Sequence, residues 1–107
     1  MMRVGMVIGI RPEKLAAYRG LHNNIWPEVA RLLADAGLAN FSIFHKDELL
    51  FGYFEYHGDN LEADLARIDE QPVMREWFAR TEPCQVPLAT RGAGEWWARM
   101  EEIFHLE

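Results

Sequence analysis

A phenol and an imidazole four residues apart are the groups in this sequence best suited to chemistry. Tyr18 and His22 precede the dipeptide Trp26-Pro27. Side chains at this spacing lie on one face of a helix, one turn apart. A neutral histidine accepts or donates a proton near pH 7, and a tyrosine hydroxyl can orient a substrate oxygen. The pair indicates a small acid–base site; the simpler alternative is a surface histidine beside a tyrosine that caps the core.

A second group of candidate residues is aromatic. Trp77 and Phe78 are adjacent in a segment with helical spacing, so their side chains point in different directions. One ring can face the core while the other lines a cavity, and aromatic faces bind the apolar C–H patches of sugars. The alternative is that both rings pack in the core. The later pair Trp96-Trp97 is assigned to packing or to a subunit contact.

Composition excludes several classes of function. The net charge is −6 and no run of Lys or Arg is present, which argues against a nucleic-acid partner. No stretch reaches the roughly 18 apolar residues of a membrane span. The single cysteine, Cys84, excludes an internal disulfide and a cysteine-rich zinc site, and no histidine pair has metal-ligand spacing. We therefore expect a cytoplasmic protein with no metal and no cofactor.

The elements that must position these residues follow from apolar periodicity and from proline and glycine. Pro12 is suited to the first turn of a helix, Pro27 should break that helix, and Gly37 should end the next one. The pattern predicts strands at 3–10, 39–45, 49–56 and 103–106, and helices at about 12–25, 27–36, 60–68 and 73–80, with a loop at 83–94.

The order of these elements predicts the fold. Strand, helix, strand, strand, helix, strand is the ferredoxin-like pattern, an antiparallel sheet with helices on one face, in a single α+β domain of residues 1–107. Phe41, Ile43, Phe51 and Tyr53 are too many apolar residues for the helix-covered face alone. A second layer is implied, and a homodimer that packs two sheets face to face supplies it. The prediction is a dimeric α+β barrel.

Tyr18 followed by the run from His22 to Glu28, His-Asn-Asn-Ile-Trp-Pro-Glu, resembles the hallmark of the L-rhamnose mutarotase family. The similarity continues through Gly37, the strand Asn-Phe-Ser-Ile at 40–43 and the helix start Pro-Val-Met at 72–74. The resemblance implies a dimeric α+β barrel that interconverts the α and β anomers of a 6-deoxy sugar without a cofactor. It also implies that His22 is the catalytic acid–base residue. The implied positions that bind the monosaccharide are Tyr18, Phe41, Trp77 and Phe78.

The sequence also departs from the family near the expected pocket. Phe41 replaces a usual tyrosine, Phe78 replaces a usual tryptophan, and residues 82–87 replace a usual Asn-Pro-Asp-Asn-Ser-Pro stretch. L-rhamnose is the expected substrate, with L-fucose or another deoxyhexose as the alternative. A dimeric α+β barrel monooxygenase and a non-catalytic ligand-binding module are alternatives of other classes.

Overall fold

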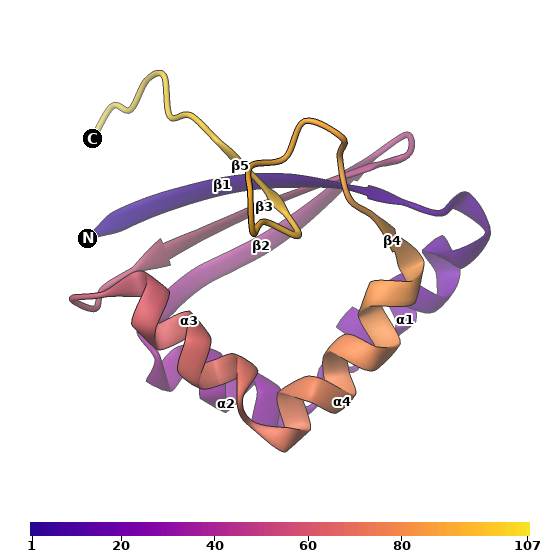
Figure 1. The fold of residues 1–107 in the computed structure, drawn as a ribbon, viewed down its shortest axis with the longest axis horizontal. Helices are drawn as coiled ribbons and strands as arrows, with labels where there is room; N and C mark the ends of the chain where they lie inside the picture. Colours follow the sequence, from indigo (N-terminus) through magenta and orange to yellow (C-terminus); the bar gives the residue numbers. More distant parts are fainter.

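A computed structural model describes all residues, 1–107, and shows a curled antiparallel sheet with four helices on one face (Figure 1). The strands are β1 (Met2–Ile10), β2 (Leu38–Lys46), β3 (Leu49–Tyr56), β4 (Gln85–Val86) and β5 (Ala98–Met100). The α-helices are α1 (Leu15–Asn23), α2 (Pro27–Asp35), α3 (Leu61–Asp69) and α4 (Pro72–Thr81), and short 3-10 turns are η1 (Pro12–Lys14) and η2 (Glu82–Cys84).

The sheet has the strand order expected of the ferredoxin-like pattern. The order is β2-β3-β1-β4, with β5 paired to the same edge of β1 as β4, and every pairing is antiparallel. Strand β1 is central, and its long pairing with β3 runs from Met2 opposite Tyr56 to Gly9 opposite Leu49. The predicted fold class is confirmed.

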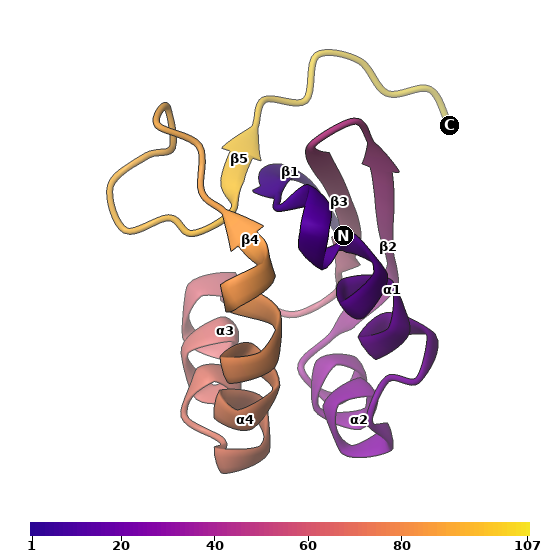
Figure 2. The same cartoon turned by 90° about the vertical axis from the view of Figure 1, so that its right-hand side faces the viewer.

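The core lies between the sheet and the helices, and the alternation of the strands builds it. Val4, Met6 and Ile8 on β1 are buried, and on β3 Leu50 and Phe54 are buried on the same face. Successive strand side chains point to opposite faces, so the intervening residues face away from the helices. Figure 2 shows that no helix covers this second face of the sheet.

Proline and glycine divide the first helical region as predicted. Trp26 has an extended backbone with ψ of 129°, and Pro27 opens α2 behind it. The break follows from the missing amide hydrogen of proline and from its steric restriction of the preceding residue. Gly37 has a φ of 97°, the left-handed conformation that glycine adopts at a helix end without strain.

The final strand predicted at 103–106 is wrong. The last strand, β5, spans Ala98–Met100, and residues 101–107 have no regular structure. The ladder between β5 and β1 ends where Met100 pairs with Gly5, and the chain then leaves the sheet. A strand needs a hydrogen-bonded neighbour, and within this chain none lies beside 103–106. Figure 1 shows this C-terminal arm, residues 101–107, on the side of the sheet away from the helices.

A bulge in β2 decides which way the middle of this strand faces. The register between β2 and β3 shifts between Ala39 and Ser42, and Asn40 has a φ of 51°. Asparagine is one of the few residues that adopt this conformation readily. Within the bulge, Phe41 packs on Phe54, which is buried on the helix face, with ring centroids 5.4 Å apart.

None of the helices is long and apolar enough to cross a membrane.

Candidate active site

Helix α1 brings Tyr18 and His22 together as their spacing predicts. Their ring centroids are 4.3 Å apart in an edge-to-face arrangement, with an interplanar angle of 64°. The ring of His22 also bonds back to its own helix, because Nδ1 lies 2.9 Å from the carbonyl oxygen of Tyr18. The imidazole is therefore held at two points, by an aromatic face and by the backbone one turn earlier.

That backbone contact determines the tautomer of His22. A carbonyl oxygen only accepts hydrogen bonds, so Nδ1 carries the proton and Nε2 of the neutral ring carries the lone pair. Burial lowers the pKa of His22 below its ordinary value of 6.5, against a smaller opposing effect of the bond to Tyr18. The neutral ring, with Nε2 free to accept a proton, is therefore the major form at pH 7.

Trp77 from α4 completes an aromatic stack around the imidazole. Its ring lies edge-to-face with His22 at 5.3 Å and with Trp26 at 5.2 Å. Trp77 is only 5% exposed and belongs to a buried cluster of the helices with Val29 and Met74. The structure thus joins Tyr18, His22 and Trp77, three of the five residues predicted for the site.

The hydroxyl of Tyr18 is hydrogen-bonded to Gln85, a residue 67 positions further along the chain. Gln85 Nε2 donates to Tyr18 Oη at 3.0 Å, and Gln85 Oε1 accepts from Trp96 Nε1 at 2.7 Å. Tyr18 and Gln85 are both buried. Burial raises the pKa of Tyr18 to about 12, although the hydrogen bond from Gln85 lowers it in part. The phenol therefore keeps its proton throughout the physiological pH range.

Phe41 and Phe78 lie apart from this stack. Phe41 is 39% exposed on β2 and contacts Phe54, and Phe78 is half-buried against the helix cluster that contains Trp77. Neither forms a ring contact with His22. Their roles in binding sugar stay predictions from the family resemblance.

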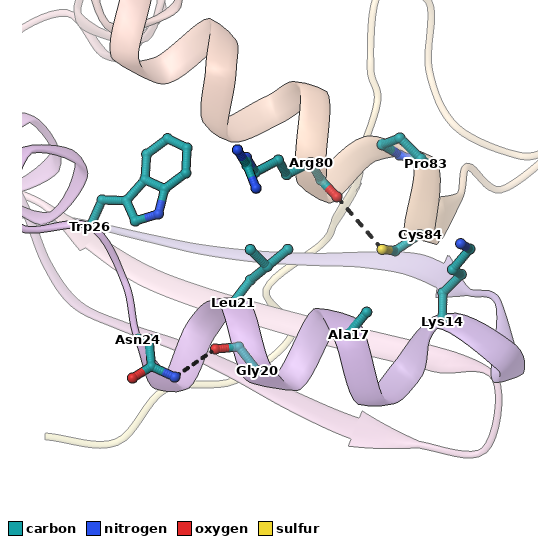
Figure 3. A pocket seen from close by; sticks show the side chains of 9 residues that line it. All are labelled: Lys14, Ala17, Gly20, Leu21, Asn24, Trp26, Arg80, Pro83 and Cys84. Carbon is teal, nitrogen blue, oxygen red and sulfur yellow. Dashed lines mark hydrogen bonds between the residues drawn. The ribbon is translucent and has the colours of Figure 1, made fainter.

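Two cavities adjoin α1, on different sides of the helix. The smaller, of about 170 Å³, lies next to the hairpin and contains both Tyr18 and His22; the other lining residues are Leu15, Arg19, Asn23, Ile43, His45 and Leu50. The larger, of about 450 Å³, lies between α1 and α4 (Figure 3) and lacks an imidazole; it is lined by Lys14, Ala17, Gly20, Leu21, Asn24, Trp26, Arg80, Pro83 and Cys84. Arg80 packs over Trp26 there, with 5.4 Å between its guanidinium and the ring centroid. The smaller cavity is the one that combines a proton acceptor with a hydroxyl.

The sequence patterns did not indicate the residues that approach Tyr18 from β4 and from the loop that follows it. Gln85 reaches Tyr18 across 67 positions, a distance that no periodicity indicates. Trp97, assigned to packing or a subunit contact, packs inside the chain over Gly52, where a Cβ atom would lie 3.3 Å from Trp97 Cζ3 and 2.8 Å from Met6 Cε. The signal available in advance was the departure of residues 82–87 from the family pattern.

No group of three or more His, Cys, Asp or Glu side chains lies close enough together to hold a metal ion. The rings of Tyr18 and Trp77 contact His22, and the other polar side chains around the cavity it lines are Arg19, Asn23 and His45. This set can exchange protons and bind hydroxyl-bearing ligands.

Comparison with solved structures places the chain in a structural class. The crystal structure of L-rhamnose mutarotase FA22100 from Formosa agariphila has a TM-score of 0.77 at 22% identity, covering 100% of both chains. Tetracenomycin F2 cyclase from Streptomyces glaucescens, a type-II polyketide cyclase, has a TM-score of 0.71 at 18% identity, covering 100% of this chain and 98% of that one. The protein has the dimeric α+β barrel fold, with Tyr18 and His22 in contact on its first helix.

The sequence comparisons identify the family within this class. Residues 3–106 match the L-rhamnose mutarotase family. An L-rhamnose mutarotase of Rhizobium meliloti (strain 1021) is 40% identical over 94 residues, covering 76% of this chain and 86% of the relative. One of Oceanobacillus iheyensis is 28% identical over 115 residues, covering 100% of both. The chain belongs to the L-rhamnose mutarotase family.

Proposed function

We propose that this protein interconverts the α and β anomers of L-rhamnose, with His22 as its catalytic residue. The observation that carries the proposal is the imidazole of His22, held through Nδ1 so that Nε2 keeps a lone pair next to a cavity shared with Tyr18. Family membership supports the same reaction. The whole chain would act as one mutarotase domain.

The proposed reaction opens the pyranose ring and closes it on the other carbonyl face. His22 Nε2 takes the proton of the anomeric hydroxyl as the bond between C1 and the ring oxygen breaks, which leaves an aldehyde. The imidazolium then gives that proton to the former ring oxygen. After rotation about the C1–C2 bond, the same two transfers run in reverse, and His22 ends neutral. Because its pKa is lowered, His22 starts the reaction as the neutral ring, and the imidazolium exists only between the two proton transfers.

The two other members of the stack have supporting roles in this proposal. Tyr18 binds a sugar oxygen through its hydroxyl, which burial keeps protonated. Trp77 exposes only 5% of its surface, so most of its ring is occupied by protein contacts. We assign it chiefly to holding the imidazole of His22 in place.

A sugar panel tests the reaction and its specificity. Saturation-exchange NMR on L-rhamnose, L-fucose and D-glucose, each with increasing protein, should show the largest gain in anomer exchange for L-rhamnose. A larger gain for L-fucose would change the assigned substrate and keep the reaction. Sugar binding without faster exchange of any aldose would instead favour a binding module, and oxygen uptake with a phenolic substrate would favour a monooxygenase.

The pH dependence of the exchange rate is a second prediction. Because burial lowers the pKa of His22 in the folded protein, the neutral, proton-accepting form persists below pH 6.5. The acceleration should therefore be larger at pH 7 than at pH 6 and fall as the pH drops through a midpoint below 6.5. NMR titration of the His22 ring should give the same midpoint. A midpoint at or above 6.5 by both measurements would contradict the role of burial.

We further propose that the protein acts as a homodimer. On the face of the sheet without helices, Phe44 is 64% and Met100 42% exposed. The C-terminal arm adds three apolar residues, Ile103, Phe104 and Leu106, that are 78–90% exposed. Exposed apolar surface on this scale is typical of interaction sites. A second copy would cover both regions at once, since a two-fold interface uses the same surfaces on both subunits.

Replacing Phe44 by glutamate tests this interface. Burying a charge between two apolar sheets is costly, so size-exclusion chromatography with light scattering should find a dimer for the parent protein and mainly monomer for Phe44→Glu. Ala30→Glu, an exposed position on α2, is the control and should stay dimeric. A parent protein that elutes as a monomer at micromolar concentration would exclude the dimer.

A further inference from the structure

We propose that Gln85 and Trp96 form a relay that orients the Tyr18 hydroxyl as a hydrogen-bond donor to the ring oxygen of the bound sugar. The relay joins Tyr18 on α1 to Gln85 and Trp96 in the C-terminal region through two hydrogen bonds, of 3.0 and 2.7 Å. The identity of the acceptor rests on the proposed mutarotase function, whereas the direction of the bonds rests on the structure alone. Gln85 and Trp96 are positioning residues in this account, since both act through Tyr18.

The chemistry of the three groups determines the direction of the relay. An indole N–H is only a donor, so the atom of Gln85 that faces Trp96 must be the amide oxygen. The amide nitrogen then faces Tyr18 and, having no lone pair to offer, must donate to the phenol oxygen. Trp96 thus prevents the amide from turning over, and the amide prevents the phenol from donating toward β4.

The consequence is a hydroxyl proton without an acceptor inside the protein. The hydrogen bond that Tyr18 Oη accepts from Gln85 is the only one it forms. Tyr18 and Gln85 are 4% and 5% exposed, so bulk water does not compete strongly for the phenol. The O–H group is left to donate to a ligand in the cavity that Tyr18 shares with His22.

A pyranose has complementary groups on both sides of its anomeric carbon. Its ring oxygen is an ether and only accepts hydrogen bonds, while its anomeric hydroxyl has a proton to give. The site offers one oriented donor, Tyr18, and one acceptor, His22 Nε2, on rings 4.3 Å apart. We therefore assign the ring oxygen to Tyr18 and the anomeric hydroxyl to His22. The bond from Tyr18 gains strength as negative charge develops on the ring oxygen during opening.

The relay lies in a region that the family resemblance implies is different from the usual pattern. Gln85 lies within residues 82–87, where the resemblance implies an Asn-Pro-Asp-Asn-Ser-Pro stretch in the family, and Trp96 follows in the same C-terminal region. The relay thus gives a role to a segment that the family motif leaves unexplained. Trp96, which is 40% exposed and was predicted to serve in packing or a subunit contact, holds the buried amide of Gln85 in this proposal.

Substitutions at Gln85 separate an oriented relay from simple packing. Gln85→Glu preserves the shape of the side chain, but its carboxylate accepts from both neighbours and draws the Tyr18 proton away from the sugar. Gln85→Leu removes both hydrogen bonds, and Trp96→Phe removes only the anchor. We expect the second-order rate constant for L-rhamnose anomer exchange to fall about three- to tenfold in Gln85→Leu, matching one hydrogen bond, and at least as far in Gln85→Glu. Gln71→Leu, an exposed glutamine at the N-terminal end of α4, is the control.

A double-mutant cycle with Tyr18→Phe distinguishes action through Tyr18 from a general structural effect. The loss caused by Gln85→Leu should vanish when the phenol hydroxyl is already absent. Equal losses in the two backgrounds, or full activity of Gln85→Glu, would overturn the relay. Trp96→Phe, at a half-exposed position, is the variant to use if either Gln85 variant fails to fold.

An experiment without sugar separates the relay from the proposed function. The ¹³C chemical shift of the Tyr18 Cζ atom follows the hydrogen bonding of the phenol, and we expect it to move in both Gln85→Leu and Trp96→Phe. A shift unchanged in both would overturn the relay whatever the protein catalyses. A second outcome is that the Tyr18 Cζ shift moves in both variants as expected but the parent protein does not accelerate anomer exchange. That result would overturn the mutarotase function and the ring-oxygen assignment, while the orientation of the phenol would stand.

Discussion

Replacing His22 with alanine should lower the protein-dependent rate of L-rhamnose anomer exchange by about 10²- to 10⁴-fold, the range typical of a lost acid–base group. The Tyr18 hydroxyl beside the imidazole cannot replace it as a base, because burial raises the pKa of Tyr18 to about 12 and the phenol keeps its proton. The measurement is saturation-exchange NMR at pH 7 with matched protein concentrations.

The control for this prediction is another histidine with no place in the site. His57 is exposed beyond the end of β3, and His57→Ala should retain the parent rate. Added imidazole should restore part of the activity of His22→Ala, since it can enter the space left by the ring. Loss of activity in both variants, or in neither, would contradict the assignment of His22.

Replacing Trp77 with alanine should lower the free energy of unfolding by about 3–5 kcal/mol, the usual cost of truncating a buried tryptophan. Trp77 is 5% exposed, lies edge-to-face with both His22 and Trp26, and links α4 to α2 through the cluster that contains Val29. Its loss leaves a cavity in the middle of the helical layer and removes one support of the imidazole. Urea unfolding followed by circular dichroism gives the free energy.

Two further variants on α4 make this prediction specific. Trp77→Phe keeps an aromatic ring in the cluster and should lose clearly less stability than Trp77→Ala. Glu76→Ala changes the neighbouring exposed position and should stay within about 0.5 kcal/mol of the parent. A loss below about 1 kcal/mol for Trp77→Ala would show that the aromatic stack does not hold the helical layer together.

The parts of the fold that depend on local signals follow from the sequence. Pro27 and Gly37 mark the ends of α2, and Asn60 accepts a hydrogen bond from the amide of Ala63 as the N-cap of α3. The spacing of Tyr18 and His22 correctly predicts their contact, because a helix alone sets it.

The features that escaped prediction depend on contacts between distant segments. The wrong strand at 103–106 has an apolar, β-prone sequence, yet a strand forms only where a neighbour offers its backbone groups. The bond between Gln85 and Tyr18 likewise depends on where β4 meets β1, as in the pairing of Ile10 with Gln85. Local sequence patterns carry no information about contacts between segments that are far apart in the chain. The difference from the family pattern that the resemblance implies at residues 82–87 points to this region but does not indicate the role of its residues.

The most direct test of the account is the rate of L-rhamnose anomer exchange as the protein concentration rises at pH 7, with His22→Ala measured beside it. We predict that the rate rises in proportion to the parent protein and stays at the uncatalysed value with His22→Ala. An exchange rate that does not change with the concentration of the parent protein, or that rises equally with the variant, would contradict the role of His22 as the proton-transfer residue of a mutarotase.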